Sequence, residues 1–281
     1  MRVLIAGAGY VGMALARRLV GEHEAYVLRR SPSAEPVEGL RSVVADLTDP
    51  DSLAALPRMD AVVVTVSADE RTPESYERAY LTTVVQLRSQ LEIEAIRPNR
   101  WIFTSSTAVH GDSGGDWVDE DSSMEPSGFA GRTLLQAEAA FLAAPWESVV
   151  VRLGGIYGPG RTRLLEQVAH GEATIPTRPT FTNRIHRDDA AGILAHLLHL
   201  PRPDPVYLGV DTDPAERGEV LRWLADRLGV PSPPTVPEPS TRGNKRASSA
   251  RLIRSGYRFM YPTYREGYAA LIAAHEAGYD A

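Results

Sequence analysis

The chain has 281 residues, a formal net charge of −6 and no cysteine, and a chain of this length forms one large domain or two modest ones. The lack of cysteine excludes disulfides, thiolate metal sites and cysteine nucleophiles, and it fits a reducing compartment. The first residues lack the pattern of a signal peptide, and no apolar stretch approaches the ~20 residues that span a bilayer. The acidic balance and the lack of a clustered basic and aromatic surface argue against nucleic acid as a partner. We therefore expect a cytoplasmic protein that acts on a small-molecule substrate, with no nucleic acid and no membrane as partner.

The basic residues are unevenly divided between arginine and lysine. Lys245 is the only lysine among the 30 basic residues, and the other 29 are arginine. The simplest interpretation of most of this skew is Arg-rich codon usage. The first half of the chain nevertheless has no lysine, which excludes phosphate binding by a P-loop.

Short apolar runs alternate with longer amphipathic segments in the first half of the chain. The apolar runs predict strands at residues 2–6, 25–28, 42–45, 61–66, 101–104 and 148–153. Amphipathic spacing predicts a helix after Gly12 and further helices over residues 74–94 and 131–144. The strands are nearly continuous in apolar character, as parallel strands buried on both faces are. The alternation predicts an α/β fold with a doubly wound parallel sheet of the Rossmann type.

The second half of the chain has a different pattern. It predicts helices over residues 161–170, 188–200 and 216–228, a strand over residues 206–210 and an extended, proline-rich connector over residues 231–239. We expect a dinucleotide-binding domain formed by residues 1–155 and 184–210. A smaller C-terminal substrate-binding domain is then formed by residues 156–183 and 211–281.

A glycine loop follows the first predicted strand and opens the first helix. Gly7 permits a tight turn, Gly9 lets the backbone approach a pyrophosphate, and Gly12 lets the helix pack close to the sheet. An anion then binds at the helix N-terminus, where N–H groups and the helix dipole favour negative charge. The alternative is a glycine-rich turn without a ligand.

The end of the second strand indicates which dinucleotide is bound. An NAD site has an acidic residue about 20 residues beyond the glycine loop, where it accepts a hydrogen bond from the ribose. This chain has Arg29, Arg30 and Ser31 there, and guanidinium groups suit a 2′-phosphate. The sequence therefore predicts NADP(H) in preference to NAD(H). The alternative is that these arginines are solvated surface residues.

Several further segments are each short but occur in a fixed order. They are Asp46-Leu47 after the third strand, residues 104–111 (TSSTAVHG), residues 152–161 (RLGGIYGPGR) and residues 183–189 (NRIHRDD). Together with the glycine loop they resemble the extended short-chain dehydrogenase/reductase superfamily, the NAD-dependent epimerase/dehydratase group. Residues 243–246 (GNKR) and 261–268 (YPTYREGY) resemble an atypical, YeeZ-like subgroup of it.

The resemblance implies a set of cofactor-binding residues that extends beyond the glycine loop. With the residues already named, the set is Gly7, Gly9, Tyr10, Val11, Gly12, Arg29, Arg30, Ser31, Asp46, Leu47, Val66, Thr104, Ser105, Gly155 and Ile156. Two helices, at residues 74–94 and 131–144, correspond to segments that form a dimer face in the family. Their periodicity fits core packing equally well, so a homodimer stays open.

The proton-transfer dyad of the superfamily is missing from the sequence. Its active members use a Tyr to exchange a proton with the substrate and a Lys four residues later to lower the pKa of that Tyr. The matching positions here are Ala130 and Leu134, and residues 125–140 contain no Tyr and no Lys.

Three residues remain as catalytic candidates. Ser106 matches the hydroxyl of the family that orients a carbonyl, and His110 stands where the family pattern has a Tyr. An imidazole titrates near neutrality and can replace a proton relay, although a histidine at a strand-to-loop turn has an ordinary structural reading. Tyr157 lies in the turn that resembles the nicotinamide-side segment, where packing under the turn is the alternative.

The segment around residues 183–189 carries further charged residues. Arg178 and Arg184 are candidates to pair with an anionic substrate group, as is Arg187, and the alternative for each is a solvated face. His186, Asp188 and Asp189 are residue types that can bind a metal, which is the alternative for this segment. The family pattern and the helix start predict a loop-to-helix entry there, and we expect no metal.

These observations predict an NADP(H)-binding, atypical extended reductase or epimerase-like enzyme that acts on a carbonyl or hydroxyl group of a small molecule. The rival is a catalytically silent NADP(H) binder that senses redox state or binds another protein. A lyase or isomerase that keeps its cofactor only for structure is a third reading.

Overall fold

The computed structural model describes residues 1–32, 37–54, 56–237 and 243–277. The fold divides into two compact units. Unit 1 comprises residues 1–109, 126–152 and 191–207, and unit 2 comprises residues 110–125, 153–190 and 208–281. The predicted domains divide the chain elsewhere, since they assign residues 110–125, 153–155, 184–190 and 208–210 to the dinucleotide-binding part.

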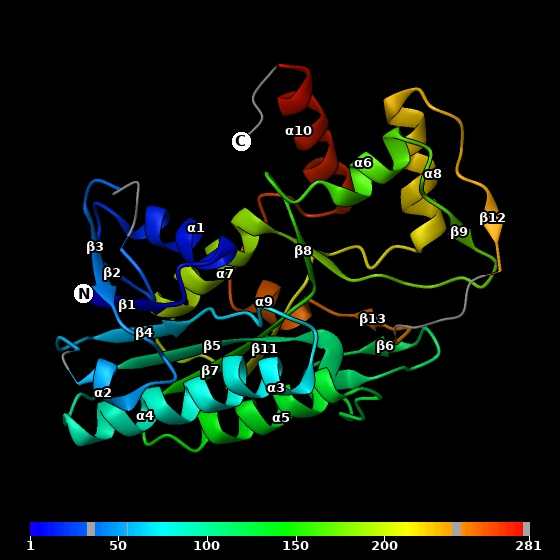
Figure 1. Ribbon diagram of the computed structural model, residues 1–281. Coiled ribbons are helices and arrows are strands. Elements are labelled where there is room, and N and C mark those ends of the chain that lie inside the picture. Colours follow the sequence, from blue (N-terminus) through cyan, green and yellow to red (C-terminus); the bar gives the residue numbers. More distant parts are fainter. Residues whose placement is uncertain (33–36, 55, 238–242, 278–281) are drawn as a thin grey trace. The chain divides into compact units, whose positions relative to one another are not determined.

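A seven-stranded parallel sheet forms the centre of the fold, which confirms the Rossmann-type prediction (Figure 1). Its strand order is β11-β7-β5-β4-β1-β2-β3. The strands are β1 (Arg2–Ala6), β2 (Glu24–Arg29), β3 (Leu40–Val44), β4 (Ala61–Val64), β5 (Arg100–Ser106), β7 (Ser148–Leu153) and β11 (Val206–Gly209). Each strand predicted from the first half of the chain is present, and the largest displacement of a start is two residues, at β3.

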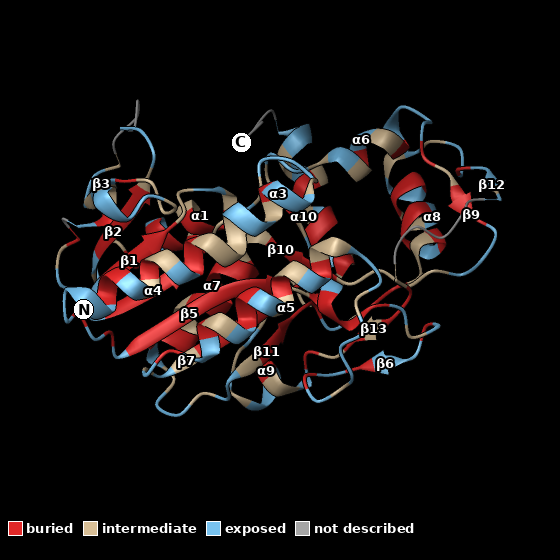
Figure 2. Ribbon diagram, turned by 60° about the horizontal axis from the view of Figure 1, so that its bottom comes forward, coloured by how far each residue is buried: buried red, intermediate tan, exposed pale blue. Residues whose placement is uncertain are grey.

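The central strands are buried on both faces. Successive residues of β1, from Val3 to Ala6, are 0% exposed, and so are all four residues of β4 (Figure 2). Helices α4 (Thr83–Ile93) and α5 (Phe129–Leu142) cover one face of the sheet, and α1 (Tyr10–Leu19) and α7 (Arg187–His199) lie on the other (Figure 1). Two buried faces explain why these strands read as continuous apolar runs rather than as alternating ones.

The helix predicted over residues 74–94 is continuous but not uniform. It consists of α3 (Pro73–Tyr76), a π-helical segment (Glu77–Thr82) and α4. The Thr72 side chain accepts a hydrogen bond from the Ser75 amide, and Pro73 occupies the first helical position, so the start is well defined. The amphipathic pattern gave the extent of the helix and did not distinguish its π-helical segment.

Unit 2 has its own apolar core. Its strands β8 (Gly155–Tyr157) and β10 (Arg184–His186) pair in parallel. The core is a cluster under three helices, α6 (Arg163–Ala169), α8 (Arg217–Leu228) and α10 (Tyr264–Glu276). It includes Val220, Leu221 and Leu224 of α8, each 0% exposed.

The prediction of a connector without strand over residues 231–239 was wrong in part. Thr235–Val236 form β12, which pairs in parallel with β9 (Ile175–Pro176). The Ile175 amide donates to the Pro234 carbonyl. Proline has no N–H to donate, but its carbonyl can still accept, so a proline-rich segment can pair in this way along the edge of a strand. Residues 238–239 of the predicted connector lie outside the described residues.

No helix within the described part of the chain combines the length and the apolar character needed to cross a membrane.

Candidate functional site

The predicted cofactor-binding residues of unit 1 meet at one edge of the sheet. Strands β5, β4, β1, β2 and β3 are neighbours and parallel, so their carboxyl ends share that edge. In this strand order the edge carries Thr104–Ser106, Val66, the glycine loop, Arg29–Ser31 and Asp46-Leu47. Open α/β sheets bind their ligands beyond the carboxyl ends of the strands. The structure therefore collects on one edge residues that span a hundred positions of sequence.

Two glycines of the loop are required by close backbone packing. Gly7 has φ +119°, and a Cβ there would lie 2.8 Å from the Thr65 carbonyl oxygen. A Cβ on Gly12 would lie 2.0 Å from the Gly7 carbonyl oxygen and 2.6 Å from Thr65 Oγ1. Thr65 Oγ1 itself donates to the Gly7 carbonyl at 2.8 Å. Sequence reasoning gave the glycine roles but missed Thr65, which fixes the turn from the next strand.

Gly9 has the opposite environment. It has φ −81°, and a Cβ built on it would have no heavy atom within 4 Å. Gly9 is also the N-cap of α1, and no side chain caps this helix terminus. An open space before an uncapped helix N-terminus fits the approach of a pyrophosphate, because the anion would satisfy N–H donors there.

The arginines after β2 are accessible. Arg30 is exposed and forms an ion pair of 3.3 Å with Asp69, and both side chains are more than half exposed. Arg29 is half-buried and Ser31 is exposed. An exposed ion pair of this kind contributes about 0–1 kcal/mol, so it would hold Arg30 only weakly against a competing anion.

Asp46 is used in a turn directly after β3. Its Oδ1 accepts hydrogen bonds from the amide and the hydroxyl of Thr48, at 2.8 and 2.7 Å. These bonds lower the pKa of Asp46, and the charges of Arg30 and Arg78 act in the same direction. Arg78 comes from the π-helical segment, and no sequence motif pointed to it.

A buried charged network lies next to Ser105, near the end of β5. Glu138 of α5 and Arg152 of β7 form an ion pair of 2.8 Å, with side chains 4% and 3% exposed. The Ser105 hydroxyl donates to Glu138 at 2.5 Å, and Thr104 donates to the Val64 carbonyl at 3.1 Å. Both hydroxyls are thus used within the protein. The network ties β5, α5 and β7 together, and sequence analysis gave no role to its two charged members.

Ser106 ends β5 and is half-buried. Its Oγ accepts a hydrogen bond from the Ala108 amide at 3.2 Å, which begins the short helix η2 (Thr107–His110). The two positions that the resemblance matches to the Tyr and Lys of the family differ from each other. Ala130 is half-buried, whereas Leu134 is 3% exposed in the apolar core.

His110 ends η2 and is 4% exposed, so it is not a surface residue. The next residue, Gly111, has φ +67°, and its carbonyl oxygen accepts a hydrogen bond from Lys245 Nζ at 2.8 Å. Lys245 is itself 6% exposed. The only lysine of the chain therefore folds back, across more than 130 residues, onto the turn that follows His110.

Tyr157 is packed in the apolar core of unit 2. It is 5% exposed and stacks on Tyr268 with ring centroids 4.6 Å apart. Its hydroxyl lies where a Cβ on Gly267 would be, and no hydrogen-bond partner is found for it in the described structure. Burial raises its pKa above the ordinary value. The packing alternative accounts for these contacts.

The neighbouring residues of β8 have backbone roles. The Gly155 amide donates to the Asn183 carbonyl at 2.8 Å, while Gly155 is exposed and Ile156 half-buried.

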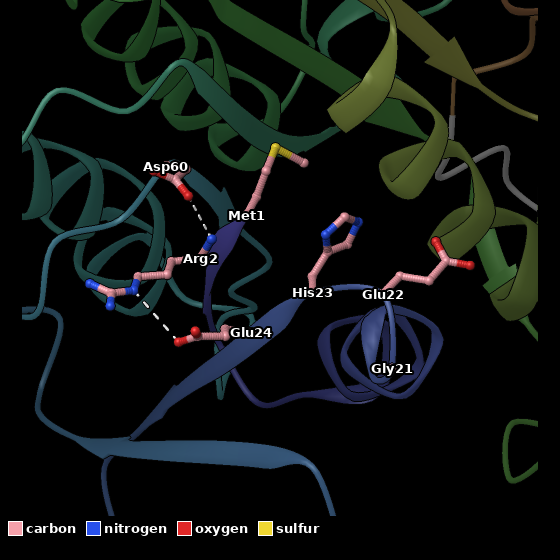
Figure 3. A pocket seen from close by; sticks show the side chains of 7 residues that line it. All are labelled: Met1, Arg2, Gly21, Glu22, His23, Glu24 and Asp60. Carbon is pink, nitrogen blue, oxygen red and sulfur yellow. Dashed lines mark hydrogen bonds and ion pairs between the residues drawn. The ribbon is translucent and has the colours of Figure 1, made fainter.

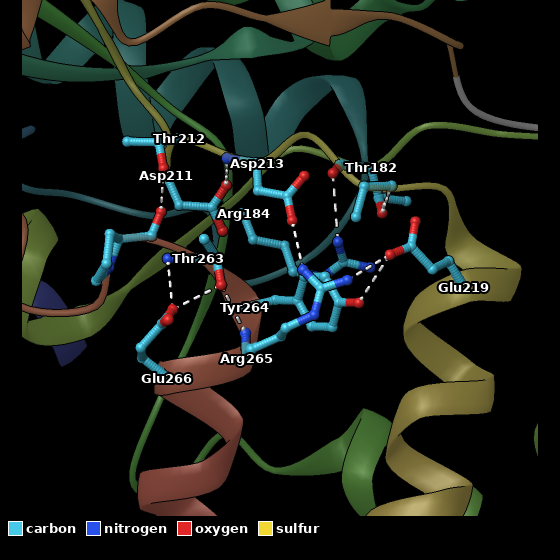
Figure 4. A network of polar contacts seen from close by, with 12 residues as sticks. Thr182, Arg184, Asp211, Thr212, Asp213, Glu219, Thr263, Tyr264, Arg265 and Glu266 are labelled. Carbon is cyan, nitrogen blue, oxygen red and sulfur yellow. Dashed lines mark hydrogen bonds and ion pairs between the residues drawn. The ribbon is translucent and has the colours of Figure 1, made fainter.

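Figure 4 shows the polar network around Arg184 in unit 2. Arg184 is 7% exposed, donates to the Thr182 carbonyl and lies over the Tyr264 ring. Burial raises the pKa of nearby Asp211 to about 8, although the charge of Arg184 opposes the shift. Arg178, by contrast, is exposed. Arg184 is therefore a buried residue of unit 2 and not part of a solvated face.

The segment around His186 is accounted for by packing and hydrogen bonds. Asp189 is 0% exposed and accepts from the Tyr257 hydroxyl and from the amides of Met260 and Tyr261, each at 2.8 Å. Burial lowers the pKa of His186, whose ring packs against Tyr261. Within the residues that the structure describes, no group of three or more His, Cys, Asp or Glu side chains is arranged to hold a metal ion.

A surface depression of about 490 Å³ lies at the opposite edge of unit 1 (Figure 3). It is lined by Met1, Arg2, Gly21, Glu22, His23, Glu24 and Asp60. These residues lie at the amino ends of β1, β2 and β4, so the depression is away from the glycine loop.

The parallel sheet and its glycine loop define a nicotinamide-dinucleotide-binding protein of the Rossmann type. The chain matches the NAD dependent epimerase/dehydratase family over residues 3–196, and it belongs to that family.

Relatives extend the match to nearly the whole chain. Protein YeeZ of Escherichia coli is 30% identical over 274 residues, which cover 93% of this chain and 96% of YeeZ. The human epimerase family protein SDR39U1 is 27% identical, again over 93% and 96% of the two chains. A putative NAD-dependent epimerase/dehydratase of Methylobacillus flagellatus has a similar structure, with a TM-score of 0.83, 38% identity and 98% of each chain covered. A structure of human SDR39U1 with NADPH has a TM-score of 0.79 at 24% identity and covers 95% of this chain and 97% of that one.

Proposed function

We propose that this protein is an NADP(H)-dependent oxidoreductase or epimerase-like enzyme acting on a carbonyl or hydroxyl group of a small molecule. The observation that carries the proposal is the open position of Gly9 before an uncapped helix, on the same sheet edge as Arg29, Arg30 and Ser106. When bound, NADP(H) would supply the hydride chemistry.

The residues of this chain have separate roles in the proposal. The glycine loop binds the pyrophosphate, and Arg29 and Arg30 bind the 2′-phosphate. Ser106 Oγ orients the substrate oxygen by hydrogen bonding, and a hydroxyl at its ordinary pKa does not itself transfer the proton. His110, or water, moves the proton instead, because an imidazole ring can both accept and donate a proton. The buried Tyr157 is the weakest of the three catalytic candidates, because an acid with a raised pKa releases its proton with difficulty.

The preference for NADP(H) is tested by replacing Arg29 and Arg30 with alanine. We expect the double variant to lose NADPH affinity by about a hundredfold or more, since each of the two charge-assisted hydrogen bonds contributes about 1.5–3 kcal/mol. NADH affinity should change little, as should NADPH affinity in the control Arg18→Ala, an exposed arginine of α1. Equal wild-type affinity for the two cofactors in a fluorescence titration would refute the preference.

The role of Ser106 is tested by the variant Ser106→Ala. We expect the rate of NADPH oxidation with a panel of aldehydes, ketones and sugar nucleotides to fall by about a hundredfold, the usual effect of losing a positioned oxyanion donor. NADPH affinity should be unchanged, and Ser127→Ala, an exposed serine, serves as the control. The enzyme hypothesis fails if the wild type oxidises no NADPH with the whole panel, or if Ser106→Ala leaves a native activity intact.

The second candidate function is a catalytically silent NADP(H) binder. It is favoured by the lack of Tyr and Lys over residues 125–140 and by the burial of Leu134 in the core at the matching position. Such a protein should distinguish NADP⁺ from NADPH by affinity, or by binding to another protein, without turnover.

A further inference from the structure

Lys245 has an unusual environment for a lysine. It is 6% exposed, and its ammonium group has three N–H donors. Over residues 1–32, 37–54, 56–237 and 243–277, Nζ makes one hydrogen bond, to the neutral carbonyl of Gly111, and no ion pair. A buried ammonium is costly unless it is paired, and one neutral acceptor satisfies a third of its donors.

The acidic residue whose charge acts on Lys245, Asp112, does not remove this cost. Burial lowers the pKa of Lys245, while the charge of Asp112 acts in the opposite direction. Asp112 Oδ1, however, accepts a hydrogen bond from the Gly114 amide at 2.8 Å, and Asp112 is exposed. The carboxylate therefore influences the ammonium group from a distance and does not contact it.

Backbone hydrogen bonds already hold the loop after His110, so the Lys245 side chain is not needed to fasten it. The amides of Ser113 and Gly115 both donate to the Asn244 carbonyl at 3.0 Å, and the Arg246 amide donates to the Asp116 carbonyl at 2.9 Å. A Cβ on Gly243 would lie 2.2 Å from the Gly111 carbonyl oxygen, so the two backbones are already in close contact. The loop after His110 is thus fastened without the lysine side chain.

The backbone of Lys245 is also fixed from its other side. Asn183 Nδ2 donates to the Lys245 carbonyl at 3.1 Å, and the Ala247 amide donates to Asn183 Oδ1 at 2.7 Å. Asn183 and Lys245 both belong to unit 2, as does His110. The ammonium group is therefore held in one place before any ligand arrives, which is the property of a binding group.

We propose that Lys245 is a ligand-binding residue, whose ammonium group, fixed on the Gly111 carbonyl beside His110, binds an anionic oxygen of the substrate, either of a carboxylate or of a phosphate. Such an oxygen supplies the countercharge that the buried ammonium lacks, and it uses N–H donors that the described protein leaves free. The inference rests on the proposed small-molecule function and adds the substrate class, an anionic carbonyl or hydroxyl compound.

The test uses the full-length protein saturated with NADP⁺, so that the glycine loop and the arginines after β2 are occupied. Malonate and inorganic phosphate are titrated by calorimetry into the wild type, Lys245→Met and Arg254→Met. Methionine keeps the length of the side chain without its charge, and Arg254 is an exposed arginine of the same unit in α9 (Ala250–Arg254). We expect the wild type and Arg254→Met to bind one of the two anions and Lys245→Met to bind it about ten to a hundred times more weakly.

Each outcome has a defined meaning. Binding of malonate alone identifies a carboxylate substrate, and binding of phosphate alone identifies a phosphorylated one. The proposal is overturned if neither anion binds, or if Lys245→Met binds as tightly as the wild type.

A measurement on the unmutated protein covers the case in which Lys245→Met does not fold. Protein labelled with ¹⁵N-lysine has a single lysine backbone amide resonance, because Lys245 is the only lysine. That resonance should shift with the titrated anion, and an unmoved resonance in the presence of bound anion refutes the proposal. NADPH titration separates the two hypotheses, because a wild type that binds no NADPH contradicts the proposed function while Lys245-dependent anion binding stands unaffected.

Discussion

Replacing Gly12 by alanine is expected to reduce both the stability of the protein and its affinity for NADPH. The new methyl group would lie 2.0 Å from the Gly7 carbonyl oxygen, so α1 must move away from the turn that it contacts. Overpacking of this kind costs about 1–3 kcal/mol of unfolding free energy. Displacement of the helix N-terminus should weaken NADPH binding by about tenfold or more. Thermal unfolding measures the loss of stability, and fluorescence titration measures the loss of NADPH affinity.

Gly9→Ala separates the two effects of Gly12→Ala. Its methyl group meets no protein atom within 4 Å and its φ of −81° suits alanine, so the melting temperature should hardly change. NADPH affinity should nevertheless fall, since the methyl group occupies the space into which the pyrophosphate comes. Gly128→Ala, at the N-cap of α5 and with equally open space, should alter stability by no more than about 1 kcal/mol and leave affinity intact. Unchanged NADPH affinity in Gly9→Ala would show that the loop does not bind the dinucleotide as proposed.

Replacing Glu138 by leucine is expected to destabilise the protein by about 3–5 kcal/mol, because Arg152 is left as a buried charge without its carboxylate. The Ser105 hydroxyl loses its acceptor in the same step. The free energy of unfolding in urea measures the effect. The variant should also shift β5 relative to α5. Because this shift reaches the glycine loop only indirectly, NADPH affinity should fall less than in the glycine variants.

A matched exposed ion pair provides the control. Arg88 and Glu92 are four residues apart on α4 with side chains 30% and 42% exposed, and Glu92→Leu should cost about 0.5 kcal/mol or less. A cost as small for Glu138→Leu as for Glu92→Leu would mean that the buried network does not stabilise the fold.

The sequence predicted the elements of unit 1 more closely than their contacts. The strands followed from apolar runs, because a strand buried on both faces needs no polar positions. The glycine spacing predicted the loop, because each glycine answers a local steric requirement. The contact of Thr65 with Gly7 did not follow, since it joins positions 58 residues apart and a threonine at a strand end carries no distinctive signal.

The candidate site was predictable to the same limited degree. Ser106, Arg29 and Arg30 stand at strand ends that the sequence already places on one edge. The burial of His110 was not predictable, because turns are ordinarily exposed and burial depends on which segments return to cover them. For Tyr157 the sequence left packing under the turn as an alternative, and its exposure of 5% agrees with that alternative. Arg152 lies in the family-like segment 152–161, yet nothing local indicates that it forms a pair with Glu138.

The sequence by itself determined that the chain has a single lysine, Lys245, and that no lysine lies in residues 125–140, where the resemblance places the proton relay. It could not show where that lysine goes, because a side chain 134 positions from Gly111 is placed by the packing of the chain between them. Only the tertiary structure put Lys245 beside the turn after His110, with Nζ bonded to the Gly111 carbonyl. Local sequence fixes steric and periodic requirements, whereas the pairing of distant charges is decided by which surfaces the fold removes from water.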